Sequence, residues 1–200
     1  MVRAAMVSAG LGCLLSFVLV NANESSALRR YETLVGPGAR VSNFGRWYAW
    51  ESLAQYYRHQ HRYDLAMEYV NRLIRSAPSN PRYWGMAGET LNGFGRYAEA
   101  VPSLIESLRR NPDRPTARTN LGIAYSALGR YPEALEEFRA AVALEGGNPD
   151  YHHNLGLAFW NVGRPDSARA EWTALLGRWP GYVRTERALR KYFGQGAARP

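Results

Sequence analysis

A repeat of 34 residues constrains the fold of this 200-residue chain more than any other feature. The tripeptide Asn120-Leu121-Gly122 recurs as Asn154-Leu155-Gly156, and the same shift carried backwards divides the chain without a gap. A period of this length is typical of helix pairs that stack on their neighbours, because one pair cannot bury its apolar face alone. The four units are 47–80, 81–114, 115–148 and 149–182.

Small and bulky side chains alternate in a fixed register and predict two packed helices per unit. A large side chain at a close helix crossing would push the helices apart. The eighth place of the units holds Ala54, Gly88, Gly122 and Gly156, and the twentieth holds Ala66, Ala100, Ala134 and Ala168. The twenty-fourth place is bulky and is expected to fill the space between a pair and its neighbour; it holds Val70, Leu104, Phe138 and Trp172.

Glycine and proline mark where these helices end. A Gly-Arg turn begins at Gly95, Gly129 and Gly163, and the first unit has His61 at the same place. The second helix is expected to stop before the thirty-second place, which holds Pro78, Pro112, Gly146 and Pro180. In the second unit, Pro102 is expected to interrupt the second helix, so this unit should exchange its amide hydrogens first.

These places resemble the pattern of the tetratricopeptide repeat family, which runs Trp, Leu-Gly, Tyr, Ala, Phe and Pro. Trp50 and Trp84 supply the early tryptophan, whereas Arg118 and His152 replace it. The leucine is present except in the second unit, where Ala87 departs from the pattern. The resemblance covers about two thirds of the chain and implies an all-α fold, a right-handed superhelix of antiparallel helix pairs with a concave groove.

Residues after the last unit are expected to close the array. The range 183–193 is predicted to be a capping helix, followed by a flexible tail over 194–200. Val183, Ala188, Leu189 and Tyr192 are expected to cover the last pair. The basic side chains should face solvent; they are Arg184, Arg187, Arg190 and Lys191.

The first residues suggest a membrane or export signal. An uncharged apolar run covers 4–20 behind Arg3, so 1–23 reads either as a signal peptide cut after Ala22 or as a retained transmembrane anchor. Either reading predicts a protein that is membrane-anchored or exported to the cell envelope, with the periplasmic side favoured. The range 24–46 is expected to hold a short helix and a linker.

The sequence offers no pattern for catalysis, and no cofactor or metal is expected. It lacks a phosphate-binding loop, a nucleophile elbow and a metalloprotease helix. His152 and His153 are adjacent on a helix and point about 100° apart, so they cannot bind one ion together. Nucleic acid is not expected either: the net charge is +8, but the basic residues are dispersed and most aromatic residues occupy packing places.

The family resemblance implies that the first helix of each pair lines the groove and binds a protein or peptide. Asn120 and Asn154 share one place in the repeat, and each amide could bond a peptide backbone at both ends. The candidate groove residues are Glu51, Gln55, Arg58, Arg82, Met86, Glu89, Thr119, Asn120, Ile123, His153, Asn154, Leu157 and Trp160.

Two functions are compatible with these features. The first is a non-enzymatic adaptor at the membrane or in the envelope that gathers partner segments in its groove. The alternative is an accessory tail or subunit of a multi-span membrane enzyme, such as a glycosyltransferase. A chaperone tail is not expected as the partner, because Glu51 and Gln55 stand where that branch of the family needs a cation and an amide.

Overall fold

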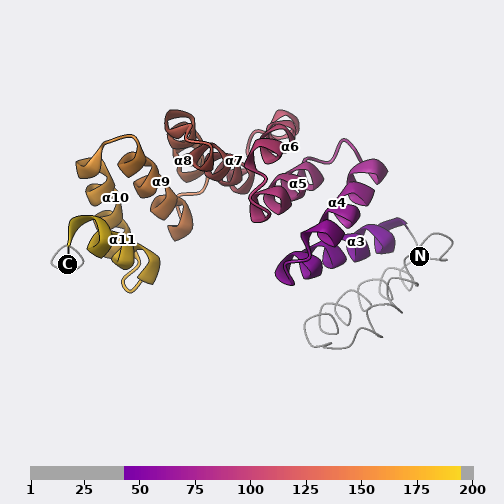
Figure 1. Cartoon of the computed structure of the whole chain (residues 1–200), viewed down its shortest axis with the longest axis horizontal. Coiled ribbons are helices and arrows are strands. Elements are labelled where there is room, and N and C mark those ends of the chain that lie inside the picture. Colours follow the sequence, from indigo (N-terminus) through magenta and orange to yellow (C-terminus); the bar gives the residue numbers. More distant parts are fainter. Residues whose placement is uncertain (1–42, 195–200) are drawn as a thin grey trace. The chain divides into compact units, whose positions relative to one another are not determined.

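The computed structural model describes residues 43–194, and within this range it contains nine α-helices and no strand (Figure 1). The apolar run, the short helix after it and the tail from residue 195 lie outside the described residues. Contacts divide the chain between Tyr83 and Trp84 into two compact units, which are described separately below. None of the described helices is both long enough and apolar enough to cross a bilayer.

The helices follow the 34-residue register. The first helices of the pairs are α3 (Asn43–His59), α5 (Pro81–Gly93), α7 (Pro115–Ala127) and α9 (Pro149–Asn161). The second helices are α4 (Tyr63–Ser76), α6 (Tyr97–Arg110), α8 (Tyr131–Leu144) and α10 (Pro165–Arg178). The chain is already helical at Asn43, before Trp47, so the last four residues of the expected linker, 43–46, belong to α3.

The turns inside the pairs share one backbone geometry, which explains the repeated glycine. Gly95, Gly129 and Gly163 have φ angles of 74°, 76° and 75°. These angles lie in the left-handed region, which is energetically unfavourable for any residue that has a Cβ atom. His61 adopts the same region with φ at 56°. In each turn the next arginine donates its backbone N–H to a carbonyl five residues earlier, as Arg96 does to Leu91 at 2.9 Å.

The small eighth place packs against the bulky twenty-fourth place of the same pair. A Cβ atom on Gly156 would lie 2.1 Å from Nε1 of Trp172, and one on Gly122 would lie 2.8 Å from the ring of Phe138. The bulky residues therefore pack within their own pair, and Trp172 also contacts the ring of Tyr192 beyond its pair, with the centroids 5.7 Å apart. The alanines of the twentieth place are fully buried, as close packing requires.

Pro102 does not interrupt α6, contrary to the expectation. The helix runs unbroken through it from Tyr97 to Arg110. Pro102 lies at the sixth helical position, where proline removes one backbone hydrogen bond and crowds the preceding turn. Its side chain is exposed, so no packing neighbour adds to that cost.

The first compact unit contains the α3–α4 pair. Its core is formed by Leu53, Val70 and Leu73, which are fully buried, together with two tyrosines. The rings of Tyr57 on α3 and Tyr69 on α4 stack with their centroids 5.8 Å apart. This aromatic contact joins the eleventh and twenty-third places of the repeat.

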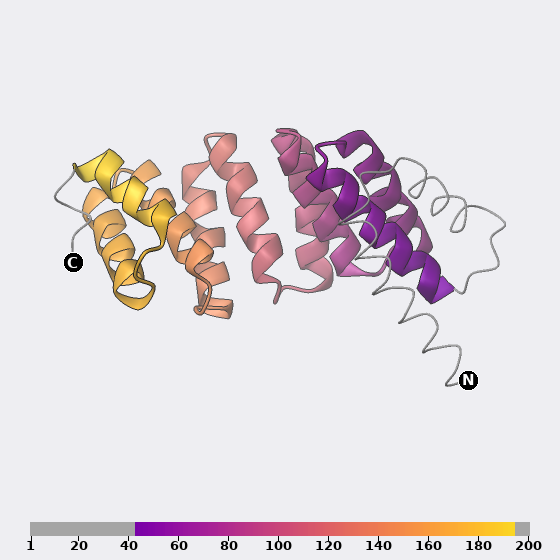
Figure 2. The same cartoon turned by 90° about the horizontal axis from the view of Figure 1, so that it is seen from below.

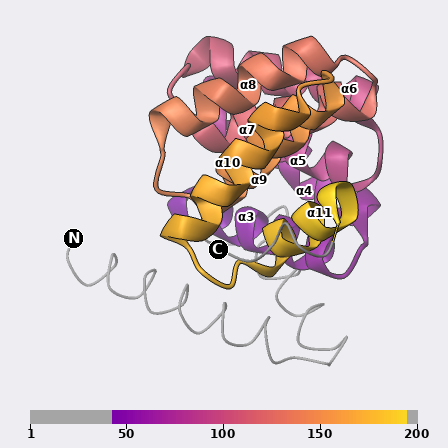
Figure 3. The same ribbon diagram turned by 90° about the vertical axis from the view of Figure 1, so that its left-hand side faces the viewer.

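The second unit extends from Trp84 through α11 (Val183–Phe193). Each pair in it contacts the next, α6 with α7 and α8 with α9, and the pairs lie side by side in Figure 2. Figure 3 faces its C-terminal end, where α11 packs on the last pair. Ala188 and Leu189 of α11 are buried as expected, but Val183 is 52% exposed and Thr185 is buried in its place.

Candidate functional site

In the first unit, the candidate groove residues are only partly available. Gln55 is exposed on α3, whereas Glu51 and Arg58 are half-buried. The guanidinium of Arg82 pairs with the carboxylate of Glu51, so these two opposite charges neutralise each other. Neither is a free charge for a ligand in this arrangement.

In the second unit, α5 and α7 contribute buried and accessible candidates. Met86 and Thr119 are buried, with 9% and 8% of their surface exposed, so they belong to the packed interior and are not accessible to a ligand. Glu89 and Asn120 are half-buried, and Ile123 is 36% exposed. The accessible candidates therefore concentrate on one face of α7.

We call the nine candidates of the second unit the first-helix face: Met86, Glu89, Thr119, Asn120, Ile123, His153, Asn154, Leu157 and Trp160.

On α9, the candidates are covered by α11. The indole of Trp160 lies 4.5 Å from the ring of Tyr192 and 5.4 Å from that of Phe193, measured between centroids. Leu157 packs against the same cluster, and Asn154 is 9% exposed. The final helix thus covers Trp160 and Leu157, two of the groove residues predicted for the last repeat.

His153 was expected in the groove but lies buried between α9 and α11. Its Nδ1 is 2.9 Å from Oγ1 of Thr185, and its backbone carbonyl accepts a hydrogen bond from Nε1 of Trp172 at 3.0 Å. Burial lowers the pKa of His153 to about 4; the cation of Arg184 lowers it further and Asp150 partly compensates. The imidazole is therefore neutral at pH 7 and serves packing.

Polar bridges between repeats were not predicted from the sequence, where Arg118 and His152 were noted only as replacing the early tryptophan. Arg118 donates to Glu137 of its own pair at 3.0 Å and to the carbonyl of Pro112 in the preceding unit at 3.2 Å. His152 makes the same two contacts, with Glu171 and with the carbonyl of Gly146. A joint change in the sequence could have revealed these bridges: where arginine or histidine replaces tryptophan at the fourth place, glutamate occupies the twenty-third.

No group of three or more metal-binding side chains occurs within 43–194. Several charged side chains there are held in ion pairs between neighbouring turns, such as Arg109 with Glu106 and Arg130 with Glu133. The first-helix face therefore offers amide and apolar contacts, together with one half-buried carboxylate on Glu89. Such a surface suits a peptide better than a small charged ligand.

Comparison with known families identifies the repeats. Three tetratricopeptide repeat models match residues 49–90, 86–149 and 149–172, which together exceed half of the chain. The chain therefore belongs to the tetratricopeptide repeat family. A search of curated proteins finds no match.

Solved structures share the fold at low sequence identity. The crystal structure of YrrB, described as a tetratricopeptide repeat protein with an unusual peptide-binding site, is 19% identical with a TM-score of 0.66; the match covers 82% of this chain and 86% of YrrB. MamA of AMB-1 is 24% identical with a TM-score of 0.63, over 80% and 92% of the two chains. MamA from Desulfovibrio magneticus RS-1 is 19% identical with a TM-score of 0.67, over 85% and 94%.

Proposed function

We propose that this protein is a non-enzymatic adaptor that binds an extended peptide segment of a partner along α7. The observation that carries the proposal is the pairing of Asn120 with the exposed Ile123 on one face of that helix. An amide fixes the backbone of a peptide, and an exposed apolar side chain accepts one of its residues. The family and the peptide-binding site named for YrrB support this function.

The amide of Asn120 is oriented for this task. Its Nδ2 donates to the carbonyl of Thr116 at 3.0 Å, which fixes the amide plane. Within the described residues, its Oδ1 accepts no hydrogen bond and is available to a peptide N–H. The corresponding amide of α9, on Asn154, is buried and contributes less, so α7 is the centre of the proposed site.

Site-specific photocross-linking tests this placement. Benzoylphenylalanine at position 123 should form adducts with a partner segment in membranes that contain the full chain. The matched control places the same group at Ile105, which is 47% exposed on α6, outside the first-helix face. Equal adduct yields at both positions would contradict the proposal.

A second variant separates binding from folding. Asn120→Ala should lower the adduct yield at position 123 several-fold, because the peptide loses an oriented acceptor. Asn71→Ala, on the exposed side of α4, should leave the yield unchanged. Both variants should melt within a few degrees of the parent, since neither amide is part of the core.

The apolar run over 4–20 supports placement at the membrane or in the cell envelope. A retained anchor should stay in the membrane pellet after carbonate extraction, whereas a cleaved signal would release the protein.

The cross-links also distinguish the adaptor from the accessory tail of a membrane enzyme. An adaptor gives adducts with several partners, and an accessory tail of a multi-span enzyme gives one polytopic partner.

A further inference from the structure

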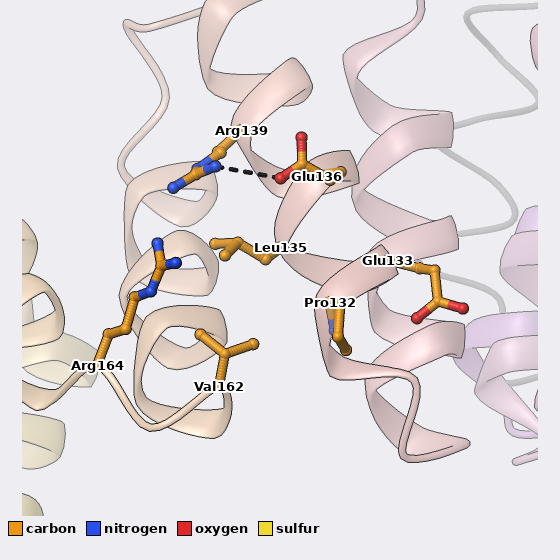
Figure 4. Close-up of a pocket in the computed structure, with 7 residues that line it drawn as sticks. All are labelled: Pro132, Glu133, Leu135, Glu136, Arg139, Val162 and Arg164. Atoms are coloured by element: carbon orange, nitrogen blue, oxygen red, sulfur yellow. Dashed lines mark hydrogen bonds and ion pairs between the residues drawn. The ribbon is translucent and has the colours of Figure 1, made fainter.

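A pocket on α8 lies apart from the first-helix face. Its volume is about 390 Å³, and its lining comes from α8 and the turn between α9 and α10 (Figure 4). Leu135 is buried at its base, and Val162 is half-buried beside it. The lining contains none of the candidate groove residues; it consists of Pro132, Glu133, Leu135, Glu136, Arg139, Val162 and Arg164.

Arg164 in this pocket lacks the glutamate partner that the equivalent arginines of the second and third repeats have. In the second and third repeats, the turn arginine pairs with a glutamate three residues later: Arg96 Nε is 2.6 Å from Glu99 and Arg130 Nε is 2.9 Å from Glu133. In the fourth repeat Ser167 stands where the glutamate would be. Arg164 consequently forms no ion pair within the described part of the chain.

A second guanidinium faces the same space. Arg139 uses one nitrogen for Glu136, at 3.1 Å, and lies over the ring of Phe159 with its Cζ 5.4 Å from the centroid. These two contacts fix its direction. Figure 4 shows the guanidinium groups of Arg139 and Arg164 pointing toward each other above Leu135 and Val162, while the carboxylate of Glu133 points away.

We infer that this pocket binds an acidic side chain of a partner peptide, with a neighbouring apolar residue on Leu135 and Val162. Two like charges that converge without an anion between them are complementary to a carboxylate, which a guanidinium binds through two parallel hydrogen bonds. The rim also carries Glu136, whose negative charge opposes a doubly charged phosphate more strongly than a singly charged carboxylate. The inference concerns a second contact surface and does not depend on the site on α7.

Nuclear magnetic resonance of the full chain in non-ionic detergent tests this inference with a defined probe. Acetyl-Glu-Leu-amide should shift the amide of Val162 and the Nε–H of Arg164, with saturation at millimolar concentration. Acetyl-Gln-Leu-amide should bind at least five-fold more weakly, because it lacks the charge. Equal shifts with both probes, or stronger binding of inorganic phosphate, would overturn the inference.

Ser167→Glu is the sharpest variant, because it supplies the missing partner of Arg164 without changing the lining. It should abolish the shift while the melting temperature stays equal or rises, since a glutamate in the first turn also suits the helix dipole. Arg164→Gln should weaken binding five- to ten-fold. The control Arg96→Gln removes the paired arginine of the second repeat and should leave binding unchanged. Binding that survives Ser167→Glu would exclude Arg164 as the anion contact.

Discussion

At the residue scale, the small residue at the eighth place, glycine in three of the four units, sets how closely the helices of a pair approach. Trp172 rests on the backbone of α9 at Gly156 and donates to the carbonyl of His153 at 3.0 Å. The large indole of Trp172 therefore fits only because glycine occupies position 156. The same relation joins Gly88 with Leu104 and Gly122 with Phe138.

Gly156→Ala should destabilise the protein by about 1–3 kcal/mol, because the added methyl group overlaps the fully buried Trp172. Urea unfolding followed by circular dichroism measures the change. Gly177→Ala is the control: this glycine lies in α10 with open space around its Cβ position, and alanine should stabilise the helix by about 0.5–1 kcal/mol. Equal effects of the two variants would show that helix propensity, and not the close contact, decides the cost.

The bridge of Arg118 to Glu137 should contribute more than an exposed ion pair. Their side chains are 24% and 21% exposed, and Arg118 also holds the carbonyl of Pro112. A double-mutant cycle with Arg118→Met and Glu137→Gln should give a coupling energy of about 1 kcal/mol. The more exposed pair of Arg72 with Glu68 should give less than about 0.5 kcal/mol. Indistinguishable values would contradict a stabilising role for the bridge.

At the element scale, the second repeat combines a glycine-rich first helix with a proline inside its second. Gly85 and Gly88 lie within α5, and each interior glycine lowers helix stability by about 0.5–1 kcal/mol relative to alanine. Pro102 removes one hydrogen bond of α6 although the helix continues through it. The third repeat has neither the additional glycines nor an interior proline beyond its first turn.

Amide hydrogen exchange should therefore be faster in α5 and α6 than in α7 and α8. Mass spectrometry of the native full chain measures both pairs in one experiment. Pro102→Ala serves as the matched variant and should slow exchange in α6, because it restores the donor that proline lacks. Slower exchange in the second repeat than in the third would contradict this ranking.

At the scale of the whole molecule, the free energy of unfolding should depend on the buried His153 between about pH 6.5 and pH 4. Its folded pKa of about 4 lies below the ordinary value of 6.5, so the unfolded chain binds the additional proton between these values. Stability is therefore complete above about pH 6.5 and falls as the pH drops toward 4. From pH 6.5 to 4.5 the loss should be about 2 kcal/mol.

Urea unfolding at several pH values checks this dependence. His153→Gln should flatten the profile above pH 4.5, because glutamine does not titrate. Carboxylates act in a lower window: the hydrogen bond from Arg109 lowers the pKa of Glu106 to about 2, so its contribution is lost only as the pH falls from about 4.5 toward 2. An unchanged slope in the variant would assign the pH dependence to another group.

The sequence by itself determined the helical repeats, because small, bulky and turn residues recur at fixed places and each unit folds by the same local contacts. It also predicted the final helix and proposed the candidate residues of the groove. Only the tertiary structure decided which candidates remain accessible, since α11 covers His153 and Trp160 through contacts that follow no repeat. It likewise brought Arg139 and Arg164 to one pocket. The repeat predicts the contacts that every unit makes, whereas the surface of the last repeat depends on α11, which does not follow the repeat.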